Sequence, residues 1–201
     1  TEIVRARHLV FRAADRHPER LADQSMALAL VLAGGALCND AVLTADAEQT
    51  DQFTALGDPT EGALLIAAAQ LGLDKAALQR ALPRVAELPF DSERKSMTTV
   101  HQIVDAAALA GQLREALAKW DYVAITKGSV DGMLEIATHV WDHDRAAPLT
   151  AEWRQRIAAA NERLAGNGMR VLGVGLRAVD GPASTAALET EVIFVGLFGM
   201  I

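Results

Sequence analysis

Apolar side chains recur at helical spacing through most of the first 82 residues. Asp58 and Pro59 suit the N-cap and first turn of a helix, and Gly72 suits the position after its last turn. The polar segment Asp46–Thr54 is predicted to be a surface loop. The predicted helices are Pro18–Asn39, Thr60–Leu71 and Asp74–Leu82.

After Pro83 the pattern changes to alternating and β-branched positions, which are typical of strands. The predicted strands are Arg84–Phe90, Ser96–Val104, Tyr122–Thr126, Arg170–Val179 and Glu191–Leu197, with helices at Ala106–Lys119, Val130–Ala137 and Ala151–Ala165. The charged piece Asp91–Lys95 is short, so it indicates a hairpin between antiparallel neighbours. We therefore expect an α+β fold, with a mainly antiparallel sheet flanked by helices, in a single domain over residues 1–201.

Composition and charge narrow the possible functions. The chain has 51% hydrophobic and 22% charged residues, as ordinary globular domains do, and its net charge of −7 argues against binding nucleic acid. Its single cysteine, Cys38, has no partner for an internal disulfide, which favours a reducing compartment. The longest apolar run, Met26–Cys38, is too short to span a bilayer. The closing apolar strand, Val192–Ile201, leads us to expect a piece of a larger protein.

The predicted hairpin places Phe90 and Lys95 at facing ends of two strands. A phenylalanine in a strand ordinarily faces the core, but the neighbouring Arg94 and Lys95 favour an exposed position for Phe90. An exposed aromatic ring can stack on a nucleic-acid base, which is worth about 1–3 kcal/mol. Phe90 is therefore a candidate platform for a base.

Three further charged residues follow turns and can point into a cleft. Glu61 lies one turn into a helix, where it either interacts with the helix dipole or accepts a hydrogen bond from an amine. Lys127 precedes Gly128 at a strand end, a common arrangement at any turn. Arg170 follows a double-glycine turn, where its guanidinium group suits either a phosphate or a surface ion pair.

Five segments of the chain carry a further signal through their order: Ala36–Asp40, Gly57–Leu64, Pro89–Met97, Lys127–Gly128 and Gly168–Leu172. Together they resemble the nucleotide-binding domain of P-type cation-transporting ATPases, in particular the calcium-pump-like branch. The resemblance covers nearly the whole chain, and Val195–Ile201 is similar to the strand that returns to the phosphorylation domain of that family.

The resemblance implies an antiparallel, twisted sheet with helices and a pocket for ATP. In that pocket Phe90 would stack on adenine, Glu61 would meet the adenine amino group, and Arg170 would reach the phosphates. The two lysines would line the pocket, and the apolar residues and the glycine would form its wall. The implied nucleotide-binding residues are Glu61, Phe90, Lys95, Met97, Lys127, Gly128, Arg170 and Leu172.

The sequence departs from the family pattern in two respects. Ser129-Val130-Asp131 stands where the family often has alanine, proline and glutamate, so the role of Asp131 stays open. The aspartyl-phosphate motif DKTGT and the magnesium-binding motif TGDGVND do not occur in these 201 residues. We therefore expect binding of ATP, with Mg²⁺ held mostly by ligands outside the chain, and no hydrolysis by the chain alone.

The resemblance also implies partners. They are the phosphorylation and actuator domains of one full-length pump, with this domain on the cytoplasmic face of the membrane and both of its ends near a hinge. A freestanding nucleotide-binding regulatory module is the alternative. A zinc site at His139, Asp142, His143 and Asp144 has a spacing that matches no dependable ligand pattern. A partner surface built from Trp120, Trp141 and Trp153 competes with core or helix-anchoring roles for these residues.

Overall fold

The computed structural model describes residues 2–5, 10–12, 25–46, 49–109, 111–182 and 187–201. Nine strands form one sheet. They are β1 (Glu2–Arg5), β2 (Val10–Arg12), β5 (Arg84–Asp91), β6 (Ser96–Gln102), β7 (Tyr122–Gly128), β8 (Ala137–Asp142), β9 (Arg145–Pro148), β10 (Arg170–Val179) and β11 (Val192–Met200). The order β2-β1-β11-β10-β7-β6-β5 is antiparallel throughout, and among the described strands only the β8–β11 pair is parallel. The expected α+β fold with a mainly antiparallel sheet is confirmed.

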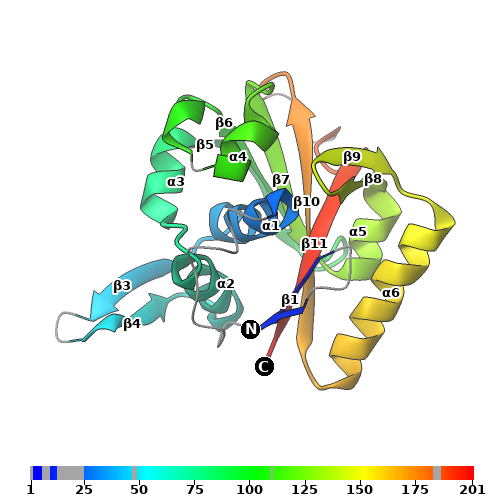
Figure 1. The fold of residues 1–201 in the computed structure, drawn as a ribbon, viewed down its shortest axis with the longest axis horizontal. Coiled ribbons are helices and arrows are strands. Elements are labelled where there is room, and N and C mark those ends of the chain that lie inside the picture. Colours follow the sequence, from blue (N-terminus) through cyan, green and yellow to red (C-terminus); the bar gives the residue numbers. More distant parts are fainter. Residues whose placement is uncertain (1, 6–9, 13–24, 47–48, 110, 183–186) are drawn as a thin grey trace.

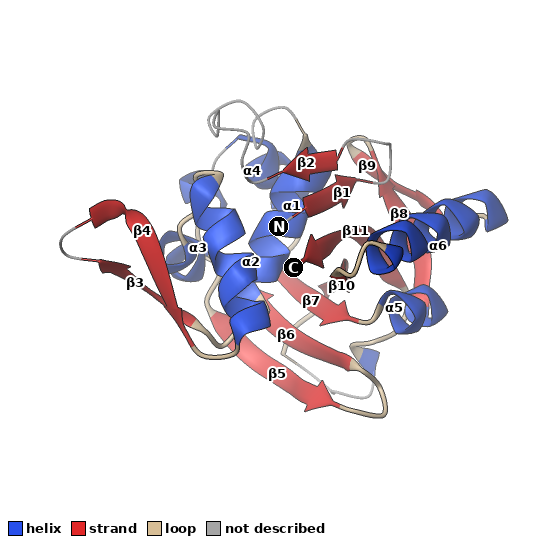
Figure 2. Ribbon diagram, turned by 90° about the horizontal axis from the view of Figure 1, so that it is seen from below, coloured by secondary structure: helices blue, strands red, loops and turns tan. Residues whose placement is uncertain are grey.

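Helices cover both faces of this sheet, as Figures 1 and 2 show. The helices are α1 (Met26–Leu37), α2 (Pro59–Gln70), α3 (Lys75–Ala81), α4 (Gly111–Leu117), α5 (Val130–Ile136) and α6 (Ala151–Gly166). One face carries α1, with α2, α3 and α4 packed around it, and the other carries α5 and α6. A smaller hairpin of β3 (Val42–Asp46) and β4 (Gln49–Leu56) projects away from the sheet.

Helix α1 is the centre of the larger hydrophobic core. All twelve of its residues are buried, which fits a helix that is apolar on every side. Gly34 and Gly35 allow it to lie close to the sheet. A Cβ added at Gly34 would lie 2.6 Å from Val174 Cγ1, and one added at Gly35 would lie 2.9 Å from the ring of Phe198. The two glycines thus allow the close packing of this helix on the sheet.

The opposite face of the sheet has its own core under α5 and α6. Met133 of α5 packs over Gly173, where an added Cβ would lie 3.2 Å from Met133 Cγ. Ile157 and Leu164 of α6 and Phe194 of β11 complete this cluster. Side chains alternate along β10, so its even-numbered residues, such as Val174, face α1 while its odd-numbered residues face α5.

Several predicted elements differ from the structure. The first helix begins at Met26 after the N-cap Ser25, and the expected start near Pro18 lies outside the described residues. The segment predicted as a surface loop is part of the β3–β4 hairpin, and 106–119 divides into a 3₁₀ turn at Ala106–Ala108 and α4. The pair β8–β9 lies between the predicted helices Val130–Ala137 and Ala151–Ala165, where no strand was predicted. Polar residues such as Thr138, His139 and Arg145 interrupt these short strands, so their apolar pattern is weak.

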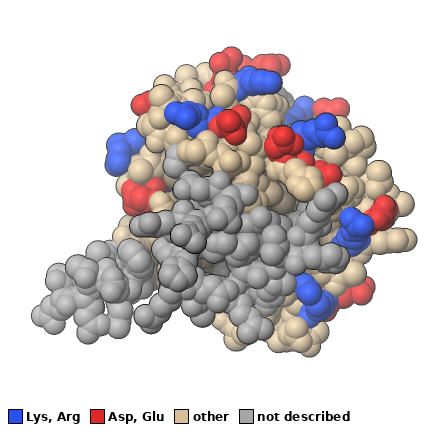
Figure 3. Space-filling view, in the orientation of Figure 1, with Lys and Arg blue, Asp and Glu red and all other residues tan. Residues whose placement is uncertain are grey.

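The outer surface has mixed character. In the described part of the face in Figure 3, Lys and Arg atoms are interspersed with Asp and Glu atoms. Within the described residues, the helices are all too short or too polar to cross a bilayer. Figures 1 and 2 both place the N and C labels close together, in agreement with the pairing of β1 with the end of β11.

Candidate functional site

A cavity of about 370 Å³ opens on the α1 side of the sheet. Its walls come from the turn after α1, the start of α2, the strand β5, and the adjoining ends of β6, β7 and β10. The lining residues are Asp40, Asp58, Thr60, Glu61, Glu87, Pro89, Phe90, Lys95, Met97, Lys127, Gly128, Arg170 and Leu172. All eight residues that the sequence nominates are among them.

The floor of the cavity is formed by three neighbouring strands. Met97 of β6 lies opposite Lys127 of β7, and Gly128 lies opposite Gly173 of β10. At Gly128 the chains approach closely, because an added Cβ would lie 2.7 Å from the carbonyl oxygen of Lys95. Only glycine fits here without moving the backbone of the β5–β6 hairpin.

The β5–β6 hairpin carries Phe90 to the edge of the cavity. Its side chain is 65% exposed, so Phe90 is not a core residue. The turn is fixed by Asp91, whose Oδ1 accepts hydrogen bonds from the backbone N–H groups of Glu93 and Arg94, both at 2.9 Å. These two bonds stabilise the ionised carboxylate and so lower the pKa of Asp91, and the bond from Arg94 has the larger effect. Lys95 has a φ of 52°, in the left-handed region, at the end of this turn.

Glu61 and Lys127 form an ion pair at the base of the cavity. Lys127 Nζ lies 2.7 Å from Glu61 Oε1, and the two side chains are only 8% and 17% exposed respectively. The other oxygen, Oε2, accepts hydrogen bonds from the backbone N–H groups of Asp40 at 2.9 Å and Ala41 at 3.2 Å. Glu61 thus holds Lys127 and the turn after α1 in place, and a ligand amine would use a remaining lone pair.

The turn after α1 is also held by two basic side chains. Lys75 Nζ donates to the carbonyl oxygens of Asn39 and Ala41, each at 2.7 Å. Arg84 donates to the carbonyl oxygens of Leu37 at 3.2 Å and Asn39 at 3.1 Å. Burial lowers the pKa of Lys75. These bonds satisfy backbone carbonyl groups of the turn, and they hold this rim of the cavity in place.

The first turn of α2 adds another fixed wall. Asp58 is the N-cap, and its Oδ1 accepts hydrogen bonds from the N–H groups of Thr60 at 2.8 Å and Glu61 at 3.2 Å. The bond from the Glu61 backbone is the main reason that the pKa of Asp58 is lowered. The cap thereby fixes the direction in which α2 presents Glu61 to Lys127.

The cavity is lined by charged groups of both signs and by apolar side chains. The carboxylates are Asp40, Asp58, Glu61 and Glu87, and the cations are Lys95, Lys127 and Arg170. An exposed aromatic ring stands with them, and Met97 and Leu172 belong to or pack against the main core. This set suits a flat ring that carries an amine and is joined to an anionic group.

The other candidate sites have different surroundings. His139 and Asp142 lie on β8, and His143 and Asp144 lie in the turn to β9. His139 Nδ1 is 2.9 Å from Thr138 Oγ1, and His143 Nε2 is 3.8 Å from Asp142 Oδ1. Across the residues that the structure describes, His, Cys, Asp and Glu side chains form no group of three or more that could hold a metal ion.

The tryptophans have packing roles rather than a shared surface. Trp141 is 5% exposed and belongs to the core around α1, and Trp120 packs against the same core. Trp153 packs on the second core under α6, with the guanidinium carbon of Arg156 5.4 Å from its ring centre. The core and helix-anchoring interpretation therefore fits all three.

Sequence reasoning missed five lining residues, namely Asp40, Asp58, Thr60, Glu87 and Pro89. Four of them lie within or next to the segments that carry the family resemblance, so their position beside those motifs was the available signal. Glu87 has no such signal. It reaches the cavity because Arg84 bonds both Asp40 Oδ1 at 2.8 Å and Glu87 Oε2 at 2.9 Å.

Comparison with known proteins gives one consistent answer. The family model described as P-type ATPase, cytoplasmic domain N, matches residues 27–201. The chain is 32% identical over 173 residues to Calcium-transporting ATPase 1 of Bacillus cereus, an alignment that covers 86% of this chain and 17% of the relative. It is 37% identical over 153 residues to Probable cation-transporting ATPase F of Mycobacterium tuberculosis, covering 76% of this chain and 15% of the relative. It is 30% identical over 169 residues to Calcium-transporting ATPase of Bacillus subtilis, covering 83% and 17%. The chain thus spans 15–17% of the length of these relatives.

Proposed function

The chain belongs to the P-type ATPase cytoplasmic domain N family, and we propose on this basis that it binds ATP for a cation-transporting pump. One observation carries the proposal. Eight residues nominated from separate sequence segments line a single cavity of about 370 Å³, with the ring of Phe90 exposed at its edge. Family membership alone leaves the position of the ligand open, and this convergence supports the cavity as that position.

In the proposed complex the adenine ring stacks on Phe90, which is worth about 1–3 kcal/mol. Met97 and Leu172, which also line the cavity, would give it an apolar wall. The exocyclic amine points to the carboxylate of Glu61, whose position the pair with Lys127 fixes. Lys95 and the exposed Arg170 are then available to the phosphates.

The chain's own contribution to catalysis is to hold and orient the nucleotide. Phosphoryl transfer needs an in-line nucleophile and a metal to offset charge. We place both outside these residues, because the motifs for the phosphorylated aspartate and for magnesium binding are missing from the sequence. Mg²⁺ would accompany the phosphates, with most of its ligands in the phosphorylation domain.

The same proposal covers the rest of the pump. Residues 1–201 act as one nucleotide-binding domain on the cytoplasmic face of a membrane, with phosphorylation and actuator domains as partners. The pairing of Glu2 in β1 with Gly199 in β11 supports a hinge at this end of the two strands, since two adjacent strands can both lead to a neighbouring domain. The relatives are named as transporting ATPases of far greater length, which supports a pump over a freestanding regulatory module.

Calorimetric titration with ATP tests the proposal. The unmodified chain is expected to bind ATP and to release no phosphate, whereas Phe90→Ala combined with Lys95→Ala should weaken binding at least tenfold, because stacking and one phosphate contact are lost. Val85→Ala is the matched control, since Val85 is an exposed apolar residue of the same strand outside the cavity. Equal affinity in the double variant and the unmodified chain would contradict the proposed pocket.

A further inference from the structure

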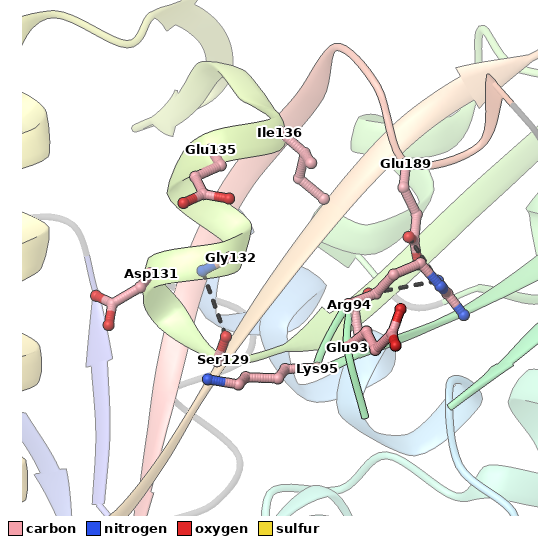
Figure 4. Close-up of a pocket in the computed structure, with 10 residues that line it drawn as sticks. Glu93, Arg94, Lys95, Ser129, Asp131, Gly132, Glu135, Ile136 and Glu189 are labelled. Carbon is pink, nitrogen blue, oxygen red and sulfur yellow. Dashed lines mark hydrogen bonds and ion pairs between the residues drawn. The ribbon is translucent and has the colours of Figure 1, made fainter. Parts of the chain in front are cut away.

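A second cavity, of about 470 Å³, lies behind the hairpin that carries Phe90 and Lys95. It is bounded by this hairpin, by α5 and by the segment before β11, and Figure 4 shows Arg94 and Glu189 in contact on one side of it, with α5 on the other. Lys95 lines both cavities, so the hairpin is the wall between them. Contacts that hold the hairpin from the side of the second cavity therefore also determine the shape of the candidate nucleotide site.

Glu189 makes the contacts that fix it. Its Oε2 lies 2.6 Å from Arg94 Nη1, and its Oε1 accepts hydrogen bonds from Ser96 Oγ at 3.0 Å and Thr98 Oγ1 at 2.9 Å. The Glu189 side chain is only 13% exposed. One carboxylate thus binds three side chains of the hairpin, and bonds to an ionised group are the strong class of hydrogen bond.

Arg94 passes this restraint to the residues that face the nucleotide. Its Nη2 donates to the carbonyl oxygen of Pro89 at 2.7 Å, directly before Phe90. On the other side of the turn, Ser96 follows Lys95, so holding the Ser96 hydroxyl fixes the backbone that carries the lysine. Glu189 is thereby connected to both Phe90 and Lys95 without touching either cavity-facing side chain.

The segment that presents Glu189 is itself anchored. Leu188 is 2% exposed and packs between Val100 of β6 and Ala124 of β7 on the reverse face of the sheet. Arg177 of β10 donates to the carbonyl oxygens of Ala187 and Thr190 on either side of Glu189. The packing of Leu188 and the bonds from Arg177 therefore hold the backbone on both sides of Glu189 in place.

We propose that Glu189 is a positioning residue for nucleotide binding, which holds Phe90 and Lys95 in their binding arrangement through Arg94 and Ser96. The inference rests on the proposed function of the neighbouring cavity. Without this restraint, the hairpin side chains become ordered only when the ligand binds. The entropy cost of ordering each side chain weakens binding by a few-fold to about tenfold.

The sign of the effect separates positioning from simple electrostatics. ATP is an anion, so removing the negative charge of Glu189 would by Coulomb's law alone strengthen its binding. Positioning predicts the reverse, a roughly tenfold weakening in Glu189→Gln. Glutamine keeps an oxygen that can accept from Ser96 and Thr98, so this variant mainly removes the ion pair with Arg94.

The experiment combines ATP titration with two-dimensional NMR of the ligand-free chain. Glu189→Gln should shift the signals of Phe90 and Lys95 before ATP is added, and then weaken ATP binding roughly tenfold. In an Arg94→Met background, the same substitution should change affinity by less than about twofold, because the link is already broken. Glu152→Gln is the matched control, since its side chain is 72% exposed and pairs with Arg156 on α6, away from the hairpin.

Other results have clear meanings. Unchanged Phe90 and Lys95 signals, or ATP binding as tight as in the unmodified chain, would overturn the role of Glu189. If the unmodified chain binds no ATP, the proposed function fails instead, and the ligand-free spectra still decide whether Glu189 sets the hairpin. Thermal unfolding of each variant shows that it is folded, and Arg94→Met tests the same link if Glu189→Gln does not fold.

Discussion

Replacing Glu61 with alanine removes the partner of a buried ammonium group. Lys127 Nζ lies 2.7 Å from Glu61 Oε1, and both side chains are more than four-fifths buried, so little water can replace the lost carboxylate. Breaking one side of a buried ion pair typically costs about 3–5 kcal/mol. Of the two backbone N–H groups that donate to Oε2, the one on Ala41 keeps its bond to Asn39 Oδ1 at 2.9 Å, and the one on Asp40 is exposed and can bind water.

We therefore expect Glu61→Ala to lower the free energy of unfolding by roughly 3–4 kcal/mol, or the melting temperature by about 10 °C for a chain of this length. Thermal and urea unfolding followed by circular dichroism would measure this loss. Glu87→Ala is the matched control, because Glu87 lines the same cavity but is 46% exposed in its pair with Arg84 and should cost at most about 1 kcal/mol.

The comparison separates two roles for Glu61. A carboxylate that served only the adenine amine would leave the ligand-free domain as stable as before when it is removed. A melting temperature within about 1–2 °C of that of the unmodified chain would refute a structural role for the three contacts of Glu61.

Three other predictions concern pH, capping and backbone approach. Burial lowers the pKa of His101 from 6.5 to about 4, so the unfolded chain binds a proton at this residue at a higher pH than the folded chain does. The free energy of unfolding is therefore unaffected by this residue above pH 6.5 and falls by up to roughly 3 kcal/mol as the pH drops to 4. Urea unfolding from pH 4 to 7 should show a shallower pH dependence in His101→Gln, and an unchanged slope would contradict this. Asp58→Ala should cost about 1 kcal/mol by removing the α2 cap, and melting curves identical to those of the unmodified chain would count against it. Gly128→Ala should cost about 1–3 kcal/mol and also weaken ATP binding, because the new Cβ displaces the backbone of Lys95; calorimetry that finds full affinity would exclude this displacement.

Local patterns predicted much of the fold. The helix α2 and the hairpin of β5 and β6 follow from signals within a few residues of each other, such as the Asp58 cap and the charged turn after Phe90. The hairpin β3–β4 was missed because its strands are polar and it projects from the main sheet. Its exposed pair Val42 and Leu56 gives no periodic apolar face to recognise.

The members of the candidate site were easier to predict than their contacts. Phe90 and Lys127 were nominated from residue type and family resemblance, and the structure places both at one cavity. That Lys127 is paired with Glu61, 66 residues earlier, depends on how α2 packs against α1, which in turn lies on β7. Glu189 acts 93 residues away from Ser96, and no pattern near either residue indicates the contact. Long-range pairing of this kind is decided by tertiary packing.

Chemical-shift mapping with ATP and GTP tests the central claim most directly. The account predicts saturable shifts at Glu61, Phe90, Lys95, Lys127 and Arg170 with ATP, and weaker binding of GTP, whose ring carries an oxygen where adenine carries the amine. Shifts confined to another surface, or equal binding of the two nucleotides with no change at Phe90, would contradict it.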